Sequence, residues 1–293
     1  MDCASHANVT RFETYCQRRE KEAVSAALPG FYTVEDKASG YGLVPQGNDW
    51  TRRLFDGDFY RTRKGFGDLP CTNLVFVQSR NLNTVADNPS ALGGGDTDKH
   101  LVYEGLSRVD ADAVLAGAAT ARSDAMMFSI WHPQLVDLRL SLGKPRHPAQ
   151  IVVTDGGNLP IERGLMFEEP ALPVFLVTNS PVAAVLRARL RDRPWVEVVD
   201  AGVPVSLPGA LRYLRTRGLH VISAIGGRRT ATALLRDGLI DDIYLTTSPI
   251  DAGEPNTPFY EGPPLNVTRV VLKGGRGSEE GVRFEHLVVS KSQ

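Results

Sequence analysis

The stretch SAIGGRRTATALLRDGLIDDIYLTTSPI, residues 223–250, contains the pattern from which the fold class is predicted. An apolar run, LHVISAI (219–225), ends at two glycines and is followed by a short amphipathic segment. A second apolar run, DIYLTT (242–247), comes directly after that segment. Short apolar runs that alternate with helical segments are typical of parallel strands joined by helical crossovers. The stretch therefore predicts a strand–helix–strand unit of an α/β protein.

The same alternation fills the chain from about residue 72 onward. The remaining apolar runs are NLVFVQ (73–78), AVLAGA (113–118), AQIVVT (149–154), PVFLVT (173–178), WVEVV (195–199) and two C-terminal runs, TRVVLK and VRFEHLVVS. Parallel strands in one sheet are joined by right-handed crossovers, whereas consecutive strands without a helix between them pair antiparallel. We expect a mostly parallel central sheet flanked by helices and completed by antiparallel C-terminal strands.

Residues 1–68 have a different character. A polar, helical stretch comes first, and the segment after it has no clear period. Eight of the 22 aromatic residues lie between Phe31 and Phe66, which argues against free disorder. We predict an irregular N-terminal arm, residues 1–68, docked on a body formed by residues 69–293.

Composition limits the classes of partner and compartment. The 293 residues include 33 basic and 34 acidic ones, so the net charge does not favour nucleic acid. The longest apolar runs are too short to span a bilayer, and the three cysteines are too few for a disulfide framework. We expect a cytoplasmic protein without a membrane or nucleic-acid partner, acting on a small molecule.

Several catalytic motifs are missing from the chain. The six histidines show no metal-ligand spacing, and no H-x-E motif accompanies a P-C-x-x-C motif, so we expect no metal. The motifs G-x-S-x-G and G-x-x-x-x-G-K-[ST] are also missing, and the run at 73–78 is not followed by G-x-G-x-x-G. A serine hydrolase, a P-loop kinase and an ordinary Rossmann dehydrogenase all fit poorly.

The glycine pair Gly226 and Gly227 stands where a strand ends and a helix begins. The first amides of a helix are unpaired and carry a partial positive charge, and residues without side chains let a phosphate approach them. Arg228, Arg229 and Thr230 follow with two charges and a hydroxyl. A tight turn is the simpler interpretation of such a pair, so a second feature is needed.

That second feature is DADAVLAGAATARSD, residues 110–124. Another strand ends here in small residues, from Gly117 to Thr120. Ligands of α/β sheets bind at the carboxyl ends of the strands. Two strand ends of this kind, each followed by a threonine, predict the two sides of one dinucleotide-binding groove.

These motifs resemble a known family. The stretches SRNLNT (79–84), LSRVDADAVLAGAATARSD (106–124) and VISAIGGRRTATALLRDGLIDDIYLTTSPI (221–250) are similar to the motifs SLDG, LRAxADAxLxGxxTxxxDxP and VxxEGGxxLxxxLLxxxLVDELxLxxxP. The family is the reductase domain of riboflavin biosynthesis, found as the C-terminal half of bifunctional deaminase-reductases, in the dihydrofolate-reductase-like superfamily. The resemblance covers about residues 72–290.

The resemblance implies hydride transfer from NADPH and a homodimer. NADH is the alternative cofactor, because a carboxylate near the ribose favours a free 2′-hydroxyl. The residues predicted to bind the cofactor are Gly117, Thr120, Thr154, Asp155, Gly156, Gly226, Gly227, Arg228, Arg229, Thr230 and Ala231.

On the substrate side, the family positions fall on Arg108, Asn83, Asp124 and Ile225. Asn83 stands where the family has an acid and Ile225 where it has a glutamate, so two carboxylates are missing. We therefore predict an altered substrate site for a small heterocycle of pterin, pyrimidine or flavin type. Asp124, or water, is the expected proton donor.

Two other interpretations stay open. A catalytically inactive nucleotide-binding or regulatory protein could keep the fold without the missing carboxylates. An α/β enzyme that binds a different diphosphate, such as a nucleotide sugar, could use the same glycines.

Overall fold

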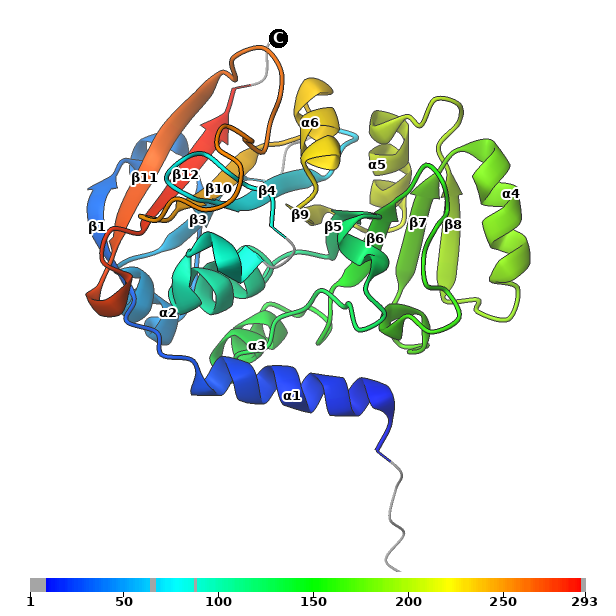
Figure 1. Cartoon of the computed structure of the whole chain (residues 1–293), viewed down its shortest axis with the longest axis horizontal. Coiled ribbons are helices and arrows are strands. Elements are labelled where there is room, and N and C mark those ends of the chain that lie inside the picture. The colour runs from blue at the N-terminus through cyan, green and yellow to red at the C-terminus, as the bar shows by residue number, and fades with distance from the viewer. Residues whose placement is uncertain (1–8, 64–66, 87–88, 291–293) are drawn as a thin grey trace, which may run out of the picture.

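The structure is a computed structural model that describes residues 9–63, 67–86 and 89–290, and a ten-stranded sheet runs through it (Figure 1). In the order in which they pair, the strands are β1 (Phe31–Asp36), β11 (Val267–Gly275), β12 (Arg283–Val289), β10 (Asp242–Thr247), β4 (Cys71–Gln78), β9 (Val221–Ile225), β5 (Ala113–Gly117), β6 (Ala149–Val153), β7 (Val174–Thr178) and β8 (Val196–Asp200).

The seven strands from β10 to β8 pair in parallel, and β12, β11 and β1 add antiparallel pairs at one end. Each apolar run singled out in the sequence forms one of these strands. The expected mostly parallel sheet with antiparallel C-terminal strands is confirmed.

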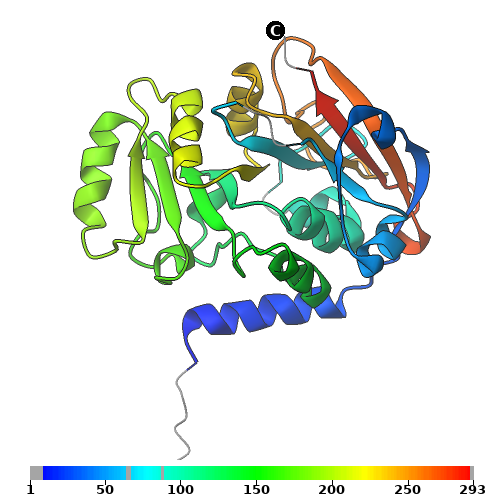
Figure 2. The same ribbon diagram turned by 180° about the vertical axis from the view of Figure 1, so that it is seen from behind.

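Helices cover both faces of the sheet (Figures 1 and 2). The α-helices are α1 (Arg11–Ser25), α2 (Asp49–Phe55), α3 (Pro133–Ser141), α4 (Ser180–Arg189), α5 (Leu207–Thr216) and α6 (Arg228–Arg236), and η3 (Thr97–Leu106) is a π-helix. Short 3₁₀ turns are η1 (Ala38–Tyr41), η2 (Pro89–Leu92), η4 (Thr120–Arg122), η5 (Leu165–Phe167) and η6 (Gly277–Glu279). In the part of the chain that the structure describes, no helix is long and apolar enough to cross a membrane.

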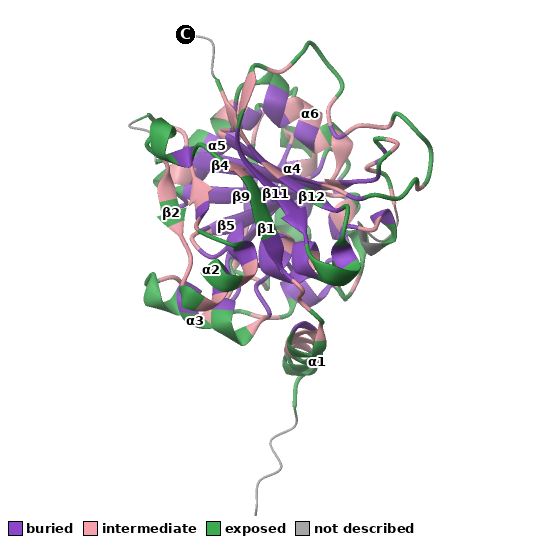
Figure 3. Ribbon diagram, turned by 90° about the vertical axis from the view of Figure 1, so that its left-hand side faces the viewer, coloured by how far each residue is buried: buried purple, intermediate pink, exposed green. Residues whose placement is uncertain are grey.

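The core lies in two layers, one on each side of the sheet. On β4, Val75 packs in the layer that contains η3 and Trp131, while Leu74 packs in the layer that contains α5 and α6. Figure 3 shows the strands buried between these layers and α1 largely exposed. Because both faces of the parallel strands are buried, their sequences are continuous apolar runs rather than alternating ones.

The N-terminal segment is more regular than its sequence indicates. Its strand β1 pairs with β11 and so extends the main sheet. A second, two-stranded sheet forms from β2 (Val44–Gln46) and β3 (Phe59–Arg61). On β1 the buried residue is Phe31 and the other side chains are exposed or intermediate, so this edge strand has no clear period. The boundary at residue 68 stays a prediction.

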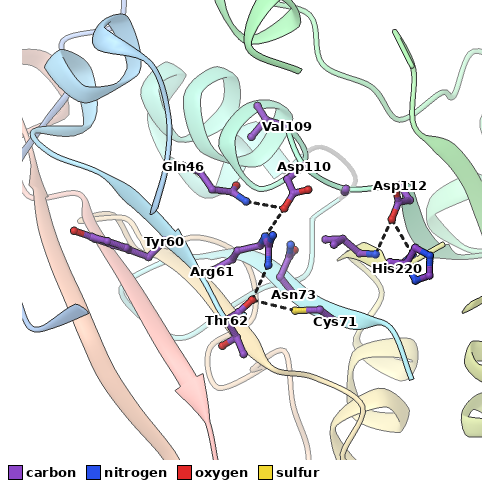
Figure 4. A network of polar contacts seen from close by, with 12 residues as sticks. Gln46, Tyr60, Arg61, Thr62, Cys71, Asn73, Val109, Asp110, Asp112 and His220 are labelled. Atoms are coloured by element: carbon purple, nitrogen blue, oxygen red, sulfur yellow. Dashed lines mark hydrogen bonds and ion pairs between the residues drawn. The ribbon is translucent and has the colours of Figure 1, made fainter. Parts of the chain in front are cut away.

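A polar network fixes the small sheet to the body (Figure 4). The Arg61 guanidinium pairs with the Asp110 carboxylate, to which Gln46 Nε2 also donates at 2.9 Å. The backbone N–H and the hydroxyl of Thr62 donate to the two carboxylate oxygens of Asp242, each at 2.8 Å. These contacts lie where the parallel strands begin, at the edge of the sheet opposite the glycine pair.

Candidate active site

The glycine pair forms a left-handed corner at the C-terminal end of β9. Gly226 has a φ of +56° and Gly227 a φ of +80°, a region that favours glycine over any residue with a Cβ. Helix α6 starts at the next residue, Arg228, and no side chain of the described residues caps its N-terminus. The first amides of α6 therefore keep unused hydrogen-bond donors at this edge of the sheet.

The exits of β5 and β9 lie side by side, because the two strands are paired neighbours. A Cβ added to Gly226 would lie 3.3 Å from Thr120 Oγ1, and one added to Gly117 would lie 2.5 Å from Thr230 Oγ1. The two threonine hydroxyls thus approach backbone that carries no side chain. We call Gly117, Thr120, Gly226, Gly227 and Thr230 the glycine corner.

The turn after β6 lies beside the glycine corner, at the carboxyl ends of the parallel strands, since β6 pairs in parallel with β5. Thr154 is buried, and its Oγ1 accepts a hydrogen bond from Gly157 N at 3.0 Å, which closes the turn. Asp155 and Gly156 are exposed. Thr154 therefore shapes the turn, while Asp155 is available to solvent.

The other residues of α6 predicted to bind the cofactor are placed differently. Arg228 points to the 258–261 loop, where its Nε donates to Pro258 O at 2.8 Å and its guanidinium pairs with Glu261. Ala231 is buried, and its N–H donates to Gly227 O at 3.0 Å, so its amide belongs to the helix ladder. Arg229 is exposed and makes no hydrogen bond or ion pair with the residues that the structure describes. Of these three, Arg229 alone keeps a free charge.

Asp124 and Ile225 offer no buried carboxylate. The Asp124 carboxylate is 41% exposed and pairs with Arg163 Nε at 2.9 Å. Ile225, the last residue of β9, is 1% exposed and packs in the core. The position where the resembled family has a glutamate is therefore an apolar part of the core.

The side-chain amide of Asn83 is not free to bind a ligand at the glycine corner, because it is engaged in hydrogen bonds within the protein. Its Nδ2 donates to Val85 O at 3.1 Å and Ala252 O at 2.8 Å, and its Oδ1 accepts from Val85 N at 2.9 Å and from the Thr257 hydroxyl at 2.5 Å. The amide thus ties the loop after β4 to the loop after β10. Its neighbours in the sequence gave no sign of this role, because Ala252 and Thr257 are remote in the chain.

Arg108 is also placed elsewhere. It precedes β5, at the edge of the sheet opposite the glycine corner, and is 2% exposed. Its Nη1 donates to Ser129 O at 2.8 Å, and its Cζ lies 4.6 Å from the centre of the Tyr103 ring. Burial lowers the pKa of this guanidinium. The Nε and Nη2 atoms of Arg108 are buried without a hydrogen-bond partner among the described residues, and its role in holding substrate stays a prediction.

A buried acid near the carboxyl ends of the parallel strands, on the side of the glycine corner, was missed by sequence reasoning. Asp98, in the first turn of η3, accepts a hydrogen bond from the Thr246 hydroxyl near the end of β10. Burial raises the pKa of Asp98 to about 7; the hydrogen bond from Thr246 opposes this shift and the charge of Glu279 adds to it. In the sequence DTDKH, this aspartate is indistinguishable from a solvated residue at a helix start.

The sheet order and the two layers of helices define an α/β fold of the dihydrofolate-reductase-like class. The chain belongs to the RibD C-terminal domain family, whose model matches residues 84–283. The predicted relationship to the riboflavin-pathway reductases is confirmed.

Individual relatives agree with this placement. A protein of Archaeoglobus fulgidus named 2,5-diamino-6-ribosylamino-4(3H)-pyrimidinone 5′-phosphate reductase is 24% identical over 151 residues, which are 52% of this chain and 68% of the relative. A pyrimidine reductase-like protein from Corynebacterium diphtheriae superposes with a TM-score of 0.63 at 23% identity, over 76% of this chain and 93% of the other. RibD of Acinetobacter baumannii superposes with a TM-score of 0.56 at 16% identity, over 76% of this chain and 58% of the other.

Proposed function

We propose that this protein is an NADPH-dependent reductase that transfers hydride to a small heterocyclic substrate of pyrimidine, pterin or flavin type. Membership of the RibD C-terminal domain family supports the reductase chemistry. The observation that carries the cofactor assignment is the glycine corner, with its two positive-φ glycines at the uncapped start of α6.

The residues of the glycine corner fit a dinucleotide. The first amides of α6 and the hydroxyls of Thr120 and Thr230 are donors of the kind that a pyrophosphate accepts. Arg229 adds an exposed charge, whereas the exposed Asp155 carboxylate favours a free ribose hydroxyl and keeps NADH as the alternative. When bound, the nicotinamide supplies the hydride, and the protein contributes alignment and the exclusion of water.

The substrate pocket is altered relative to the motifs that the chain resembles. Ile225 has no acceptor, and the Asn83 amide is engaged in hydrogen bonds between two loops. An aminopyrimidine donor left without its acceptor costs about 1–3 kcal/mol, so these positions disfavour that substrate. We therefore propose a heterocycle other than the one in the name of the Archaeoglobus relative.

The proton that completes the reduction needs a source. The Asp124 carboxylate is engaged by Arg163 on a half-exposed surface. Asp124 was one of two candidates, and this ion pair favours the other one, water, as the donor that we propose.

The test is a titration of NADPH and NADH fluorescence with the wild type and Gly227→Asp. A carboxylate at Gly227 would face the phosphates and would require a strained φ, so the variant should bind NADPH at least about tenfold more weakly. Gly238→Asp is the matched control, because Gly238 also has a positive φ, lies at the other end of α6 and has open space around it. Equal binding by the wild type and Gly227→Asp would refute the phosphate site.

A second candidate is a nucleotide-binding protein without catalytic activity, favoured by the apolar Ile225 and the engaged Asn83 amide. It predicts NADPH binding without oxidation of the cofactor in the presence of pterin, flavin or pyrimidine acceptors. Turnover with any of these acceptors would rule it out.

A further inference from the structure

Helix α1 lies along the side of the molecule that α3 also occupies (Figures 1 and 2). Its first residue, Arg11, makes three contacts with residues that are distant in the sequence. Arg11 Nη2 donates to Asp124 O at 3.0 Å, Arg11 Nη1 donates to Arg163 O at 2.8 Å, and the guanidinium pairs with Glu168. Arg11 thus joins the N-terminal segment to the loop that follows β5.

That loop starts in the glycine corner. Thr120, whose hydroxyl approaches Gly226, opens turn η4, and Asp124 comes four residues later. The Asp124 carbonyl accepts from Leu165 N at 2.8 Å as well as from Arg11, and the Asp124 carboxylate pairs with Arg163. Arg11 therefore binds both partners of the ion pair that closes the loop.

The rest of α1 is held by other contacts. Tyr15 packs edge-on against Trp131 with ring centres 5.6 Å apart, and Phe12 packs against His147 with ring centres 5.7 Å apart. The Arg19 guanidinium pairs with Glu104 of η3, and both side chains are largely buried. Since these contacts do not involve Arg11, the helix can stay docked when Arg11 is truncated.

We infer that Arg11 is a positioning residue for cofactor binding, which it supports by holding the backbone at Asp124 and, through η4, the hydroxyl of Thr120. This inference rests on the proposed function. Arg11 does not contact the glycine corner, so its effect passes through the three residues between Thr120 and Asp124. The inference also gives the N-terminal segment a role in the site.

The experiment compares Arg11→Ala and Arg11→Lys with Arg18→Ala in the full chain. Arg18 is a matched control, because it lies on the same helix, is 61% exposed and interacts with Glu22 and Tyr15 of that helix. Three quantities are measured: hydrogen exchange of residues 120–126, the dissociation constant for NADPH, and the melting temperature.

We expect Arg11→Ala to speed exchange at residues 120–126 and to raise the NADPH dissociation constant roughly threefold to tenfold, the effect of losing about one or two half-exposed charged hydrogen bonds. Arg11→Lys should recover part of the affinity, and all variants should melt near the wild type. A purely structural role would instead lower the melting temperature without a selective change in residues 120–126.

The outcomes separate the two proposals. If the wild type binds NADPH and Arg11→Ala matches Arg18→Ala in affinity or in exchange at residues 120–126, the positioning role is overturned. If the wild type does not bind NADPH at all, the proposed function is overturned, while faster exchange in Arg11→Ala would still show that Arg11 holds the loop.

Discussion

Replacing Asp98 with asparagine tests the electrostatics of the sheet edge. Asparagine keeps the oxygen that accepts from the Thr246 hydroxyl but cannot ionise. The pKa of Asp98 is raised by burial from 3.8 to about 7. At about 1.36 kcal/mol per pH unit, this shift corresponds to at most about 4 kcal/mol of stability that depends on pH.

The direction in which stability changes with pH follows from which state, folded or unfolded, binds the proton. Between the unfolded and folded pKa values, the folded protein carries a proton on Asp98 and the unfolded chain does not. Stability from this group is therefore fully present below about pH 4 and is lost as the pH rises through about 7. Asp98→Asn removes this loss, so the variant should match the wild type in acid and exceed it in free energy of unfolding by up to about 4 kcal/mol above neutrality.

Urea unfolding of the wild type and the variant from about pH 4 to about pH 9 measures this difference. Comparing the two proteins at each pH cancels the titration of all other groups that they share. Asp96→Asn is the control, because Asp96 is exposed and lies two residues away. A stability difference between wild type and Asp98→Asn that stays constant over this range would refute the argument that burial keeps Asp98 protonated.

Two further predictions concern the glycine corner and the loops beside it. Gly117→Ala would bring a Cβ to 2.5 Å from Thr230 Oγ1, so it should displace that hydroxyl and weaken NADPH binding by about tenfold in a fluorescence titration, whereas Gly40→Ala, with open space, should have no effect. Asn83→Ala removes four partly buried hydrogen bonds and should lower the free energy of unfolding by about 2–4 kcal/mol in urea; a loss below about 0.5 kcal/mol would contradict the role of Asn83 in joining the two loops.

Local sequence patterns were enough to predict the parallel strands and the glycine pair at the end of β9. Each parallel strand is buried on both faces, so it can be predicted from its continuous apolar run without knowledge of its neighbours. The turn at Gly226 and Gly227 could also be predicted, because the left-handed φ that they adopt is a local requirement that few other residues meet. Such features depend on residues close together in the chain.

Only the three-dimensional structure shows which side chains are free to bind a ligand. Arg228 was expected at a phosphate and instead pairs with Glu261, and Asn83 was expected at the substrate and instead joins two loops. The acidity of Asp98 depends on its burial beside β10, which nothing in its own segment indicates. Hydrogen bonding and desolvation act between residues that are distant in the chain. The order of residues along the chain therefore cannot reveal which charged groups are already paired or neutralised within the protein.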